Sequence, residues 1–376
     1  MRLRIALVAP LPPPRGGIST WTEGLLRVGK EDSDIEILHV DSAVHYRSPE
    51  ALGSLTRIIG GLSHGAALLC KTAWALLFRN IDVVHICTSG SLGAYRDLFL
   101  VAFARILRVP TVVHVRFGRL PALVASPNWE TAQLGRIFKL SRWVIVLDST
   151  SAEAVRVLTP GCSVSVIPNP AWKLDEVMAS TVDCGESKVL VFVGHVIPAK
   201  GIRELVLACR DILDPAFKME IVGPVQEQFR QELEVVARAR DGGKWLTISG
   251  QVENEEALAR MAGGFAVVLP SYTEGFPNVV LEAMMLGKPV IATPAGAIPE
   301  MLSDGGDKPC GVCVPIGDVD ALRNAIKSLL NEPGQALEMG QRGRERVMRE
   351  YSAGAVYPQY KSIWKSAVID HNPAAV

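Results

Sequence analysis

The sequence lacks the marks of several protein classes. Lys and Arg together number 39, as do Asp and Glu, so the formal net charge is zero, which argues against nucleic acid as a partner. The dinucleotide fingerprint G-x-G-x-x-G does not occur, and we find no cluster of metal-ligand residues. No internal repeat or low-complexity segment appears. We therefore expect a globular protein that needs neither a metal ion nor another cofactor.

Cysteine is scarce and unpatterned. The seven Cys are odd in number and scattered, which suits a reducing cytosol better than a disulfide framework. Cys310 and Cys313 form a C-x2-C pair, but no second pair completes a zinc site, so we expect a turn there. The start, MRLRIALVAPLPPP, imitates a signal peptide. Its apolar part, Ile5–Ala9, is short and runs into prolines, so it is better interpreted as a first strand.

The length and the apolar pattern predict two α/β domains. A chain of 376 residues exceeds one ordinary core. Short apolar runs alternate with helical segments, which predicts doubly wound parallel sheets. Between Trp172 and Ser187 the chain turns polar and loses this rhythm, so we place the domain boundary there. The expected domains are residues 1–172 and 173–352, and residues 353–376 are expected to form a terminal helix.

Charge is divided unequally between the two halves. Residues 1–172 carry 18 Lys and Arg against 12 Asp and Glu, whereas the remainder carries 21 against 27. A basic first half suits an anionic membrane surface or a phosphate-bearing acceptor, although an uneven solvated surface gives the same count. The apolar stretch Leu55–Phe78 is interrupted by Arg57, Gly60, Gly61, His64 and Lys71 and is therefore a poor bilayer span. Core packing and docking on a membrane both stay open for it.

The most informative segment runs from Leu269 to Met301. An apolar run ends at Pro270, a polar loop follows, and apolar residues recur from Asn278 to Leu286 until Gly287 stops them. In a parallel sheet such a loop faces a ligand, and a helix start favours phosphate. Glu274 and Glu282 suit hydroxyl groups, because carboxylates accept O–H bonds well. A phosphate cradle flanked by hydroxyl-binding acids predicts a sugar nucleotide, whereas two solvated glutamates on a capped helix are the alternative.

A second loop points to the same ligand. The run Lys188–Val193 ends in Gly194 and His195, and Lys200 is expected in the first turn of a helix over Ile202–Ile212. A cation there opposes the helix dipole unless an anion is bound nearby. This mismatch favours a bound diphosphate.

The string EGFPNVVLEAM, followed by GKPVIAT and Glu300, resembles the donor-site signature of retaining GT-B glycosyltransferases of family 4. The resemblance implies two Rossmann-like domains that face each other across a cleft. The first would bind the acceptor and the second the nucleotide-sugar donor, with the terminal helix crossing back to the first domain.

The resemblance also implies roles for individual residues. Lys200, Glu274 and His114 would be catalytic, with Lys200 on the diphosphate and the other two on the donor sugar. His114 ends a strand in VVHVRFG, where a purely structural His is the alternative. His195 stands where the family usually has Arg, and either Arg203 or His195 itself, as imidazolium, would compensate for the lost cation. Arg116 is a candidate for phosphate or an acidic acceptor. The implied donor contacts are Gly16, Gly17, Gly194, His195, Val252, Phe276, Pro277, Asn278, Val279 and Glu282.

We therefore expect a retaining, metal-independent transferase that moves a sugar from a nucleotide sugar, with UDP favoured, to a glycan or polyprenyl-linked acceptor for cell-surface polysaccharide. It is expected in the cytoplasm, with peripheral contact at the inner face of the membrane. Two alternatives stay open. One is a non-catalytic sugar-nucleotide binder, because His195 replaces a cation. The other is a UDP-sugar 2-epimerase of the same architecture.

Overall fold

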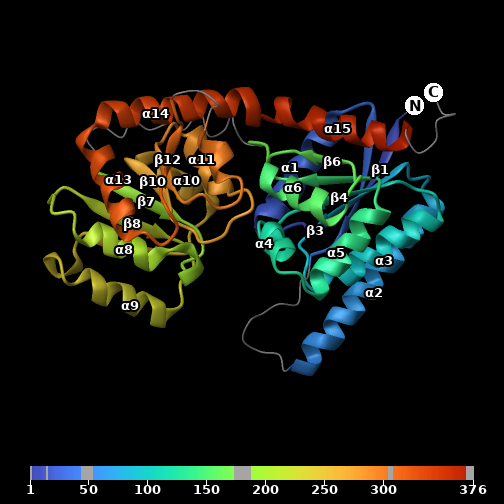
Figure 1. The fold of residues 1–376 in the computed structure, drawn as a ribbon, viewed down its shortest axis with the longest axis horizontal. Coiled ribbons are helices and arrows are strands. Elements are labelled where there is room, and N and C mark those ends of the chain that lie inside the picture. The colour runs from blue at the N-terminus through green and yellow to red at the C-terminus, as the bar shows by residue number, and fades with distance from the viewer. Residues whose placement is uncertain (1, 14–15, 44–53, 173–187, 304–307, 370–376) are drawn as a thin grey trace. The chain divides into compact units, whose positions relative to one another are not determined.

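The computed structural model describes residues 2–13, 16–43, 54–172, 188–303 and 308–369, with the backbone alone over residues 54–64. The chain divides into two compact units (Figure 1), Met1–Trp172 with Ala353–Val376, and Lys173–Ser352. We expected the division at these residues. The acceptor-binding and donor-binding roles of the units stay predictions, and residues 173–187 of the expected boundary lie outside the described part. Each unit is described by itself.

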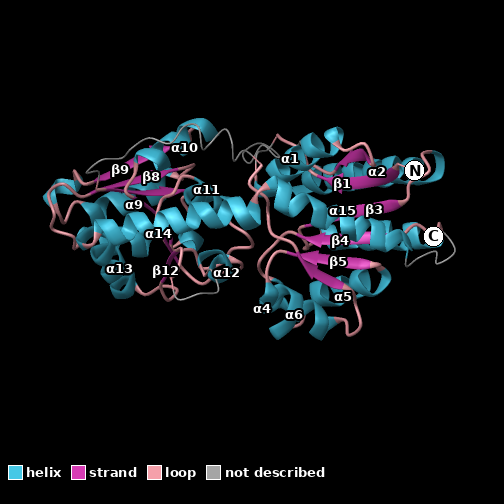
Figure 2. Ribbon diagram, turned by 90° about the horizontal axis from the view of Figure 1, so that it is seen from above, coloured by secondary structure: helices cyan, strands magenta, loops and turns pink. Residues whose placement is uncertain are grey.

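Unit 1 is built on a parallel sheet of six strands in the order β2-β1-β3-β4-β5-β6, of which β1, β3, β4 and β5 are labelled in Figure 2. Its strands are β1 (Leu3–Ala9), β2 (Ile35–Asp41), β3 (Val83–Thr88), β4 (Thr111–Val115), β5 (Trp143–Val146) and β6 (Val164–Val166). Its helices are α1 (Gly17–Glu31), α2 (Ser54–Phe78), α3 (Gly93–Ile106), α4 (Leu120–Ala125), α5 (Trp129–Leu140), α6 (Ser149–Leu158) and α15 (Ala353–Ile369).

The helices of unit 1 cover both faces of this sheet. Side chains from α2, α3, α5 and α6 share one buried apolar cluster with one face of the strands. Side chains from α1 and α15 share a second cluster with the opposite face. Both faces of the central strands are therefore buried, which is why β3 is apolar apart from His85 and its last residue, Thr88.

Unit 2 repeats the plan with the strand order β12-β11-β10-β7-β8-β9, again all parallel. Its strands are β7 (Val189–Val193), β8 (Lys218–Val222), β9 (Leu246–Gly250), β10 (Ala266–Leu269), β11 (Val290–Ala292) and β12 (Gly311–Cys313). Its helices are α8 (Ile202–Arg210), α9 (Glu227–Ala237), α10 (Asn254–Gly263), α11 (Asn278–Met285), α12 (Ile298–Leu302), α13 (Val319–Asn331) and α14 (Pro333–Arg346), with short helices η1 (Pro198–Lys200), η2 (Asp241–Gly243) and η3 (Val347–Tyr351).

Two local predictions are wrong. The C-x2-C segment is not a turn, because Gly311–Cys313 pairs with β11 as the edge strand β12, with Cys310 buried and Cys313 exposed. Lys200 does not lie in the first turn of α8. It ends η1, and Gly201 in the left-handed conformation separates it from the helix.

The C-terminal helix α15 completes the core of unit 1. Trp364 has no exposed surface, and its indole N–H donates to Nδ1 of His85 at 2.9 Å. The indole N–H of Trp21 donates to the hydroxyl of Tyr360 at 3.1 Å. At the end of α1, Asp32 accepts bonds from Tyr357 and Lys361. Unit 1 therefore depends on residues that follow unit 2 in the chain.

We expect Trp364→Ala to lower the free energy of unfolding by about 3–5 kcal/mol, because it removes a buried aromatic side chain and leaves a cavity. Trp129→Ala is the matched control: Trp129 is 47% exposed, and its loss should cost less than about 1 kcal/mol. Urea unfolding followed by circular dichroism checks both variants. Equal unfolding midpoints would contradict the core position of Trp364.

Candidate active site

The loops that follow β7, β10 and β11 meet at the carboxyl edge of the unit 2 sheet. Gly201 has φ +66°, and a Cβ at this position would lie 2.1 Å from the carbonyl oxygen of Pro270. Gly296 has φ +56°, and its Cβ would lie 2.4 Å from the carbonyl oxygen of Glu274. The amide of Ala297 donates to the carbonyl of Gly275 at 2.8 Å. Glycine at both positions thus lets the three loops touch.

Lys200 and Glu274 form an ion pair inside this junction. The Nζ of Lys200 lies 2.6 Å from Oε1 of Glu274, and the two side chains are 23% and 11% exposed. Ser271, which is fully buried, donates its hydroxyl to the same oxygen at 2.6 Å. The hydroxyl of Thr293 in turn donates to the carbonyl of Ser271. Two donors therefore hold one carboxylate oxygen in place.

The N-terminus of α11 begins four residues after Glu274. Its N-cap is Pro277, which makes no side-chain cap, and its first turn contains no acidic residue. Phe276 is 8% exposed and packs edge-on against Tyr351 at 5.8 Å between ring centroids. Backbone N–H groups at such a helix start attract anions. A cation, a fixed carboxylate and a helix N-terminus therefore share this edge.

The other predicted donor residues of unit 2 lie around the pair. Gly194 and His195 belong to the loop that carries Lys200, and His195 is exposed, as is Arg203 in the first turn of α8. Val252 lies two residues past β9 at the same edge. Pro277, Asn278 and Val279 open α11, and Glu282 lies one turn further along it. Their contacts with a donor stay predictions.

Sequence reasoning missed the residues that support this pair. Ser271 donates to Glu274, and Thr293 donates to the carbonyl of Ser271. Tyr272 donates its hydroxyl to Glu204 of α8 at 3.0 Å. The run SYTEG places Ser271 three residues before Glu274, which is a local signal that could have identified it. Thr293 and Glu204 give no such signal.

Unit 1 presents a helix N-terminus at the corresponding edge of its own sheet. Gly16 is the N-cap of α1 and Gly17 its first residue, and the first turn contains no acidic residue. A Cβ on Gly16 would meet nothing within 4 Å, so the protein itself does not require glycine there. Residues 14 and 15 of this loop lie outside the described part.

His114 lies at the end of β4 as predicted, but it is not at the surface. Its ring has no exposed area and contacts Trp21, His85 and Tyr360. Burial and the neighbouring Arg116 hold the pKa of His114 well below its usual range. The position favours the structural alternative over direct contact with a donor sugar, because the ring is covered by its own unit.

Arg116 is buried without a carboxylate partner among the described residues. Its Nη1 donates to Oδ1 of Asn169 at 2.7 Å, its guanidinium lies 4.7 Å from the ring of Trp21, and its Nε has no hydrogen-bond partner. Burial lowers the pKa of this guanidinium. A buried cation that lacks a counter-ion is costly unless a ligand compensates it.

The hydrogen bonds beside Arg116 are also one acceptor short. Trp364, His85, His114 and Arg116 form a line with contacts of 2.9, 3.3 and 3.3 Å. Two neutral imidazoles supply one N–H each, and Trp364 and Arg116 each supply another. The four N–H groups outnumber the three contacts, so at one contact in the line two donors face each other.

A buried group of possible metal ligands, His85, Cys87 and His114, lies in the same region. The indole of Trp364 donates to Nδ1 of His85, which leaves the proton on Nε2, the nitrogen that faces His114. The guanidinium of Arg116 lies beside His114. The N–H groups of Trp364 and Arg116 suit neutral imidazole rings that accept hydrogen bonds. They do not suit a metal cation at the same place. Asp32 and Asp34, which have D-x-D spacing, both pair with Lys361.

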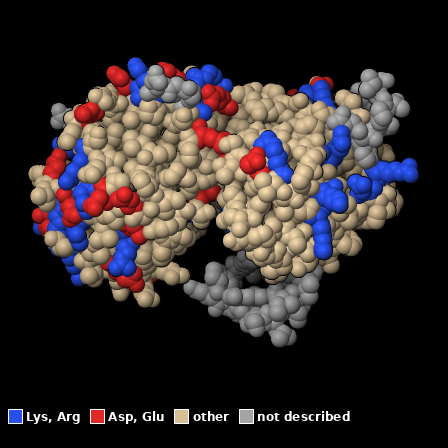
Figure 3. Space-filling view, viewed as in Figure 1, with Lys and Arg blue, Asp and Glu red and all other residues tan. Residues whose placement is uncertain are grey.

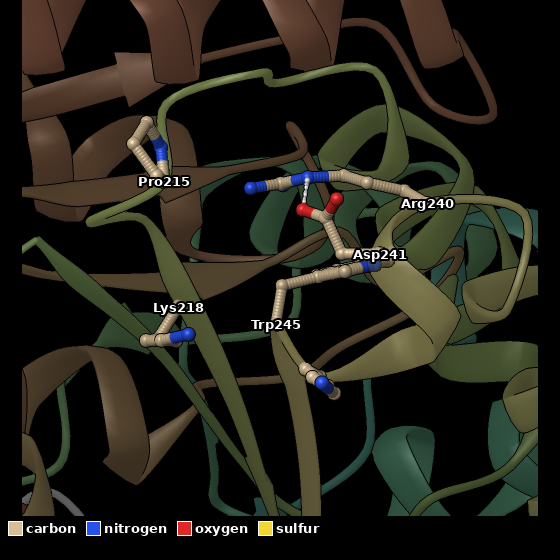
Figure 4. Close-up of a pocket in the computed structure, with 6 residues that line it drawn as sticks. Pro215, Lys218, Arg240, Asp241 and Trp245 are labelled. Carbon is tan, nitrogen blue, oxygen red and sulfur yellow. Dashed lines mark ion pairs between the residues drawn. The ribbon is translucent and has the colours of Figure 1, made fainter.

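A separate pocket of about 470 Å³ lies in unit 2 (Figure 4). The adjacent residues Arg240 and Asp241 line it and pair with each other at 3.4 Å, and Lys218 and Trp245 adjoin the amino ends of β8 and β9. This is the sheet edge opposite to the Lys200–Glu274 pair, so the pocket is not part of the candidate site.

The family of unit 2 can be identified from its sequence. Residues 175–346 match the family model described as glycosyl transferases group 1. Residues 175–346 belong to this family. One curated relative, the MMP alpha-(1->4)-mannosyltransferase of Mycolicibacterium hassiacum, is 29% identical over 189 residues, which are 48% of this chain and 44% of the relative. The chain thus spans less than half of that relative's length.

Solved structures share the whole fold. Sucrose-phosphate synthase from Thermosynechococcus elongatus superposes with a TM-score of 0.73 at 20% identity, covering 97% of this chain and 98% of that one. Anabaena HepE, solved in complex with UDP, gives a TM-score of 0.71 at 17% identity and covers 97% and 100%. The predicted GT-B fold with two Rossmann-like domains is confirmed.

The glycine at position 201 can be tested against a second glycine with nearly the same φ. Gly201→Ala should lower the free energy of unfolding by about 3 kcal/mol or more, because the added Cβ collides with Pro270. Gly242 has φ +64° but open space around it, so Gly242→Ala should cost only the backbone strain of about 1–2 kcal/mol. Chemical denaturation checks both variants. Similar costs would mean that the close approach to Pro270 is unimportant.

The buried histidines predict a pH-dependent stability. Burial, and then Arg116, lowers the pKa of His85 to about 3, whereas an unfolded His titrates near about 6.5. The stability from keeping His85 neutral is fully present above the unfolded pKa and is lost as pH falls from about 6.5 towards 3, at up to about 1.4 kcal/mol per pH unit. Denaturation of the parent between about pH 7.5 and 5 measures this slope.

His85→Gln retains polar atoms beside Trp364 but cannot titrate, so its stability should depend less steeply on pH than that of the parent. His195→Gln, at an exposed histidine, should keep the parent slope. A parental slope in His85→Gln would show that His85 does not control the pH dependence.

Proposed function

We propose that the protein transfers a sugar from a nucleotide-sugar donor to a glycan or polyprenyl-linked glycan acceptor in cell-surface polysaccharide synthesis. The observation that carries the proposal is the Lys200–Glu274 pair beside the N-terminus of α11. The membership of residues 175–346 in the group 1 family supports it, as does the fold shared with HepE, which was solved with UDP.

The pair divides the recognition of the donor between its two members. The Nζ of Lys200 has three N–H bonds, so it can keep Glu274 and still donate to a diphosphate oxygen. The backbone N–H groups that open α11 would bind the same diphosphate. Glu274, whose Oε1 is already held by Ser271, would present Oε2 to sugar hydroxyls. Glu282 would bind the ribose, and Val252 would adjoin the base.

These contacts suggest how the reaction would be catalysed. When the bond between the anomeric carbon and the diphosphate breaks, negative charge grows on the departing phosphate oxygen, where Lys200 and α11 would stabilise it. The acceptor oxygen bonds to the anomeric carbon and its proton passes to the departing phosphate. Attack from the side that the diphosphate leaves would retain configuration. With the charge held by protein groups, we propose a metal-independent reaction.

Arg116 makes an anionic acceptor the best match for unit 1. The guanidinium is buried, lacks a carboxylate partner in the described part of the chain, and faces a competing donor at His114. A phosphate or carboxylate on the acceptor would supply the missing negative charge. A polyprenyl-linked acceptor carries such a diphosphate, and its use would place the protein at the inner face of the cytoplasmic membrane.

The first test measures nucleoside diphosphate release from UDP-, GDP- and ADP-sugars, in EDTA, with and without a polyprenyl-diphosphate sugar. We expect release from one donor, faster with acceptor. Turnover of the sugar nucleotide without acceptor and without release would favour the epimerase. Binding without turnover on every donor and acceptor would favour the non-catalytic binder.

Lys200→Ala and Glu274→Ala should each lower release by roughly 10²–10³ fold, because each removes a contact that matters most in the transition state. The matched control is Lys188→Ala, since Lys188 and Asp214 form another 2.6 Å ion pair in the same unit, away from the site. It should release nucleoside diphosphate at the parent rate. Near-parent activity in either site variant would remove that residue from the mechanism.

A further inference from the structure

Helix α2 is apolar on two opposite sides. Leu68, Ala75 and Leu76 are buried in the apolar cluster on one face of the unit 1 sheet. On the other side Trp74, Leu77 and Phe78 are 52%, 55% and 68% exposed. A surface helix normally turns charged residues to solvent, and one that is apolar all round is normally covered. The exposed side of α2 therefore lacks the solvent-facing chemistry of an ordinary surface helix.

Helix α3 also exposes apolar side chains on its outer side. Tyr95, Phe99 and Ile106 are 51%, 57% and 77% exposed, and Leu92 at the N-cap is 77% exposed. Spacings of three, four and seven residues place these side chains on one stripe of the helix. Trp129 at the start of α5 stacks on Tyr95 with 5.5 Å between ring centroids.

The exposed apolar side chains of α2 and α3 lie on the outer side of the helices that cover one face of the sheet. Helices α2 and α3 pack beside each other, as do α3 and α5, and all three bury their inner sides in one cluster (Figure 1). The outer sides therefore face the same way. We name this surface the α2–α3 face and define it by Trp74, Leu77, Phe78, Leu92, Tyr95, Phe99 and Ile106. Exposed aromatic and aliphatic side chains gathered in this way mark an interaction site.

The charge on and around the α2–α3 face has one sign. The segment from Gly65 to Arg108 carries five cations, Lys71, Arg79, Arg96, Arg105 and Arg108. Its two acids are Asp97, which is fully buried and paired with Arg96, and Asp82, which accepts a bond from the amide of Arg4. On the side of the molecule that Figure 3 shows, Lys and Arg over unit 1 stand between wide uncharged areas with few acids.

We propose that the α2–α3 face rests on an anionic lipid bilayer. Trp and Tyr suit the boundary between headgroups and acyl chains, Phe, Leu and Ile suit the region below it, and the surrounding cations suit anionic headgroups. None of the helices in the described ranges has the length and apolar character that crossing a bilayer demands. A second copy of the chain fits less well, because a symmetric contact would bring the two sets of cations together.

This inference deepens the proposed function, since a polyprenyl-linked acceptor lies in such a bilayer, but it can be tested separately. The experiment measures co-sedimentation of the full chain with phosphatidylcholine vesicles, with and without phosphatidylglycerol. We expect binding to the anionic vesicles that weakens with salt, and much weaker binding to the neutral ones.

The variant Trp74→Ser/Phe99→Ser should lower the partition coefficient for anionic vesicles roughly tenfold or more. Val235→Ser/Leu337→Ser replaces two side chains of unit 2 that are 63% and 67% exposed and should bind like the parent. Lys71→Gln/Arg105→Gln should weaken binding by roughly fivefold for each cation. Its control is Lys218→Gln/Lys244→Gln at the pocket of unit 2.

Equal partition of the Trp74→Ser/Phe99→Ser variant and the parent would overturn the proposal. A parent protein that does not bind anionic vesicles would also overturn it. So would a parent that self-associates, if the Trp74→Ser/Phe99→Ser substitutions abolish that self-association. Circular dichroism confirms that each variant is folded. Binding of nucleoside diphosphates is measured in parallel and should be unchanged, so that a failure of vesicle binding is distinguished from a failure of the proposed transfer.

Discussion

The candidate site depends on the ion pair between Lys200 and Glu274. The two residues come from loops 74 positions apart in the chain, and glycines allow the close backbone approaches at this junction. A Cβ on Gly201 would collide with Pro270, and a Cβ on Gly296 would collide with Glu274 and Gly275. Ser271 fixes the carboxylate, and Thr293 ties Ser271 to the next strand. Because the pair is partly covered, its charges interact more strongly than exposed ones and hold each other in a defined position before any donor arrives. The site is thus organised by backbone contact first and by charge second.

Unit 1 has a different organisation at its sheet edge. Its polar residues are interior: His85 and His114 are neutral rings, and Arg116 is a cation held by Asn169 and the face of Trp21. Desolvation keeps the two imidazoles uncharged, and a neighbouring guanidinium strengthens that preference. The two units share a fold, yet one edge offers a lysine paired with a carboxylate and the other an arginine that has no carboxylate partner among the described residues. Such a difference suits two ligands of different charge and shape.

Helices and strands with a clear local pattern of apolar residues could be predicted from the sequence. The apolar spacing from Asn278 and the stop at Gly287 predict α11, and the strands β1, β7, β8 and β10 are largely apolar runs directly followed by Gly or Pro. β12 was missed because the C-x2-C spacing of Cys310 and Cys313 was interpreted as a turn. The Lys200–Glu274 bond could not be predicted, since each residue alone suggested its own ligand. Nor could the burial of His114, because Trp364, which orients His85 beside it, lies 279 residues after His85. Long-range contacts decide what a local pattern leaves open.

Helix α15 has a consequence for the order in which the protein is made. Unit 2 ends at Ser352, and the last helix of unit 1 begins at the next residue. A ribosome therefore releases all of unit 2 before it releases Tyr360 and Trp364, whose side chains close over Trp21 and His85. Until then the α1 side of the first sheet is open to water and to other nascent chains. Unit 1 is synthesised first but completes its fold last, and until then a chaperone would bind the exposed α1 side of its sheet.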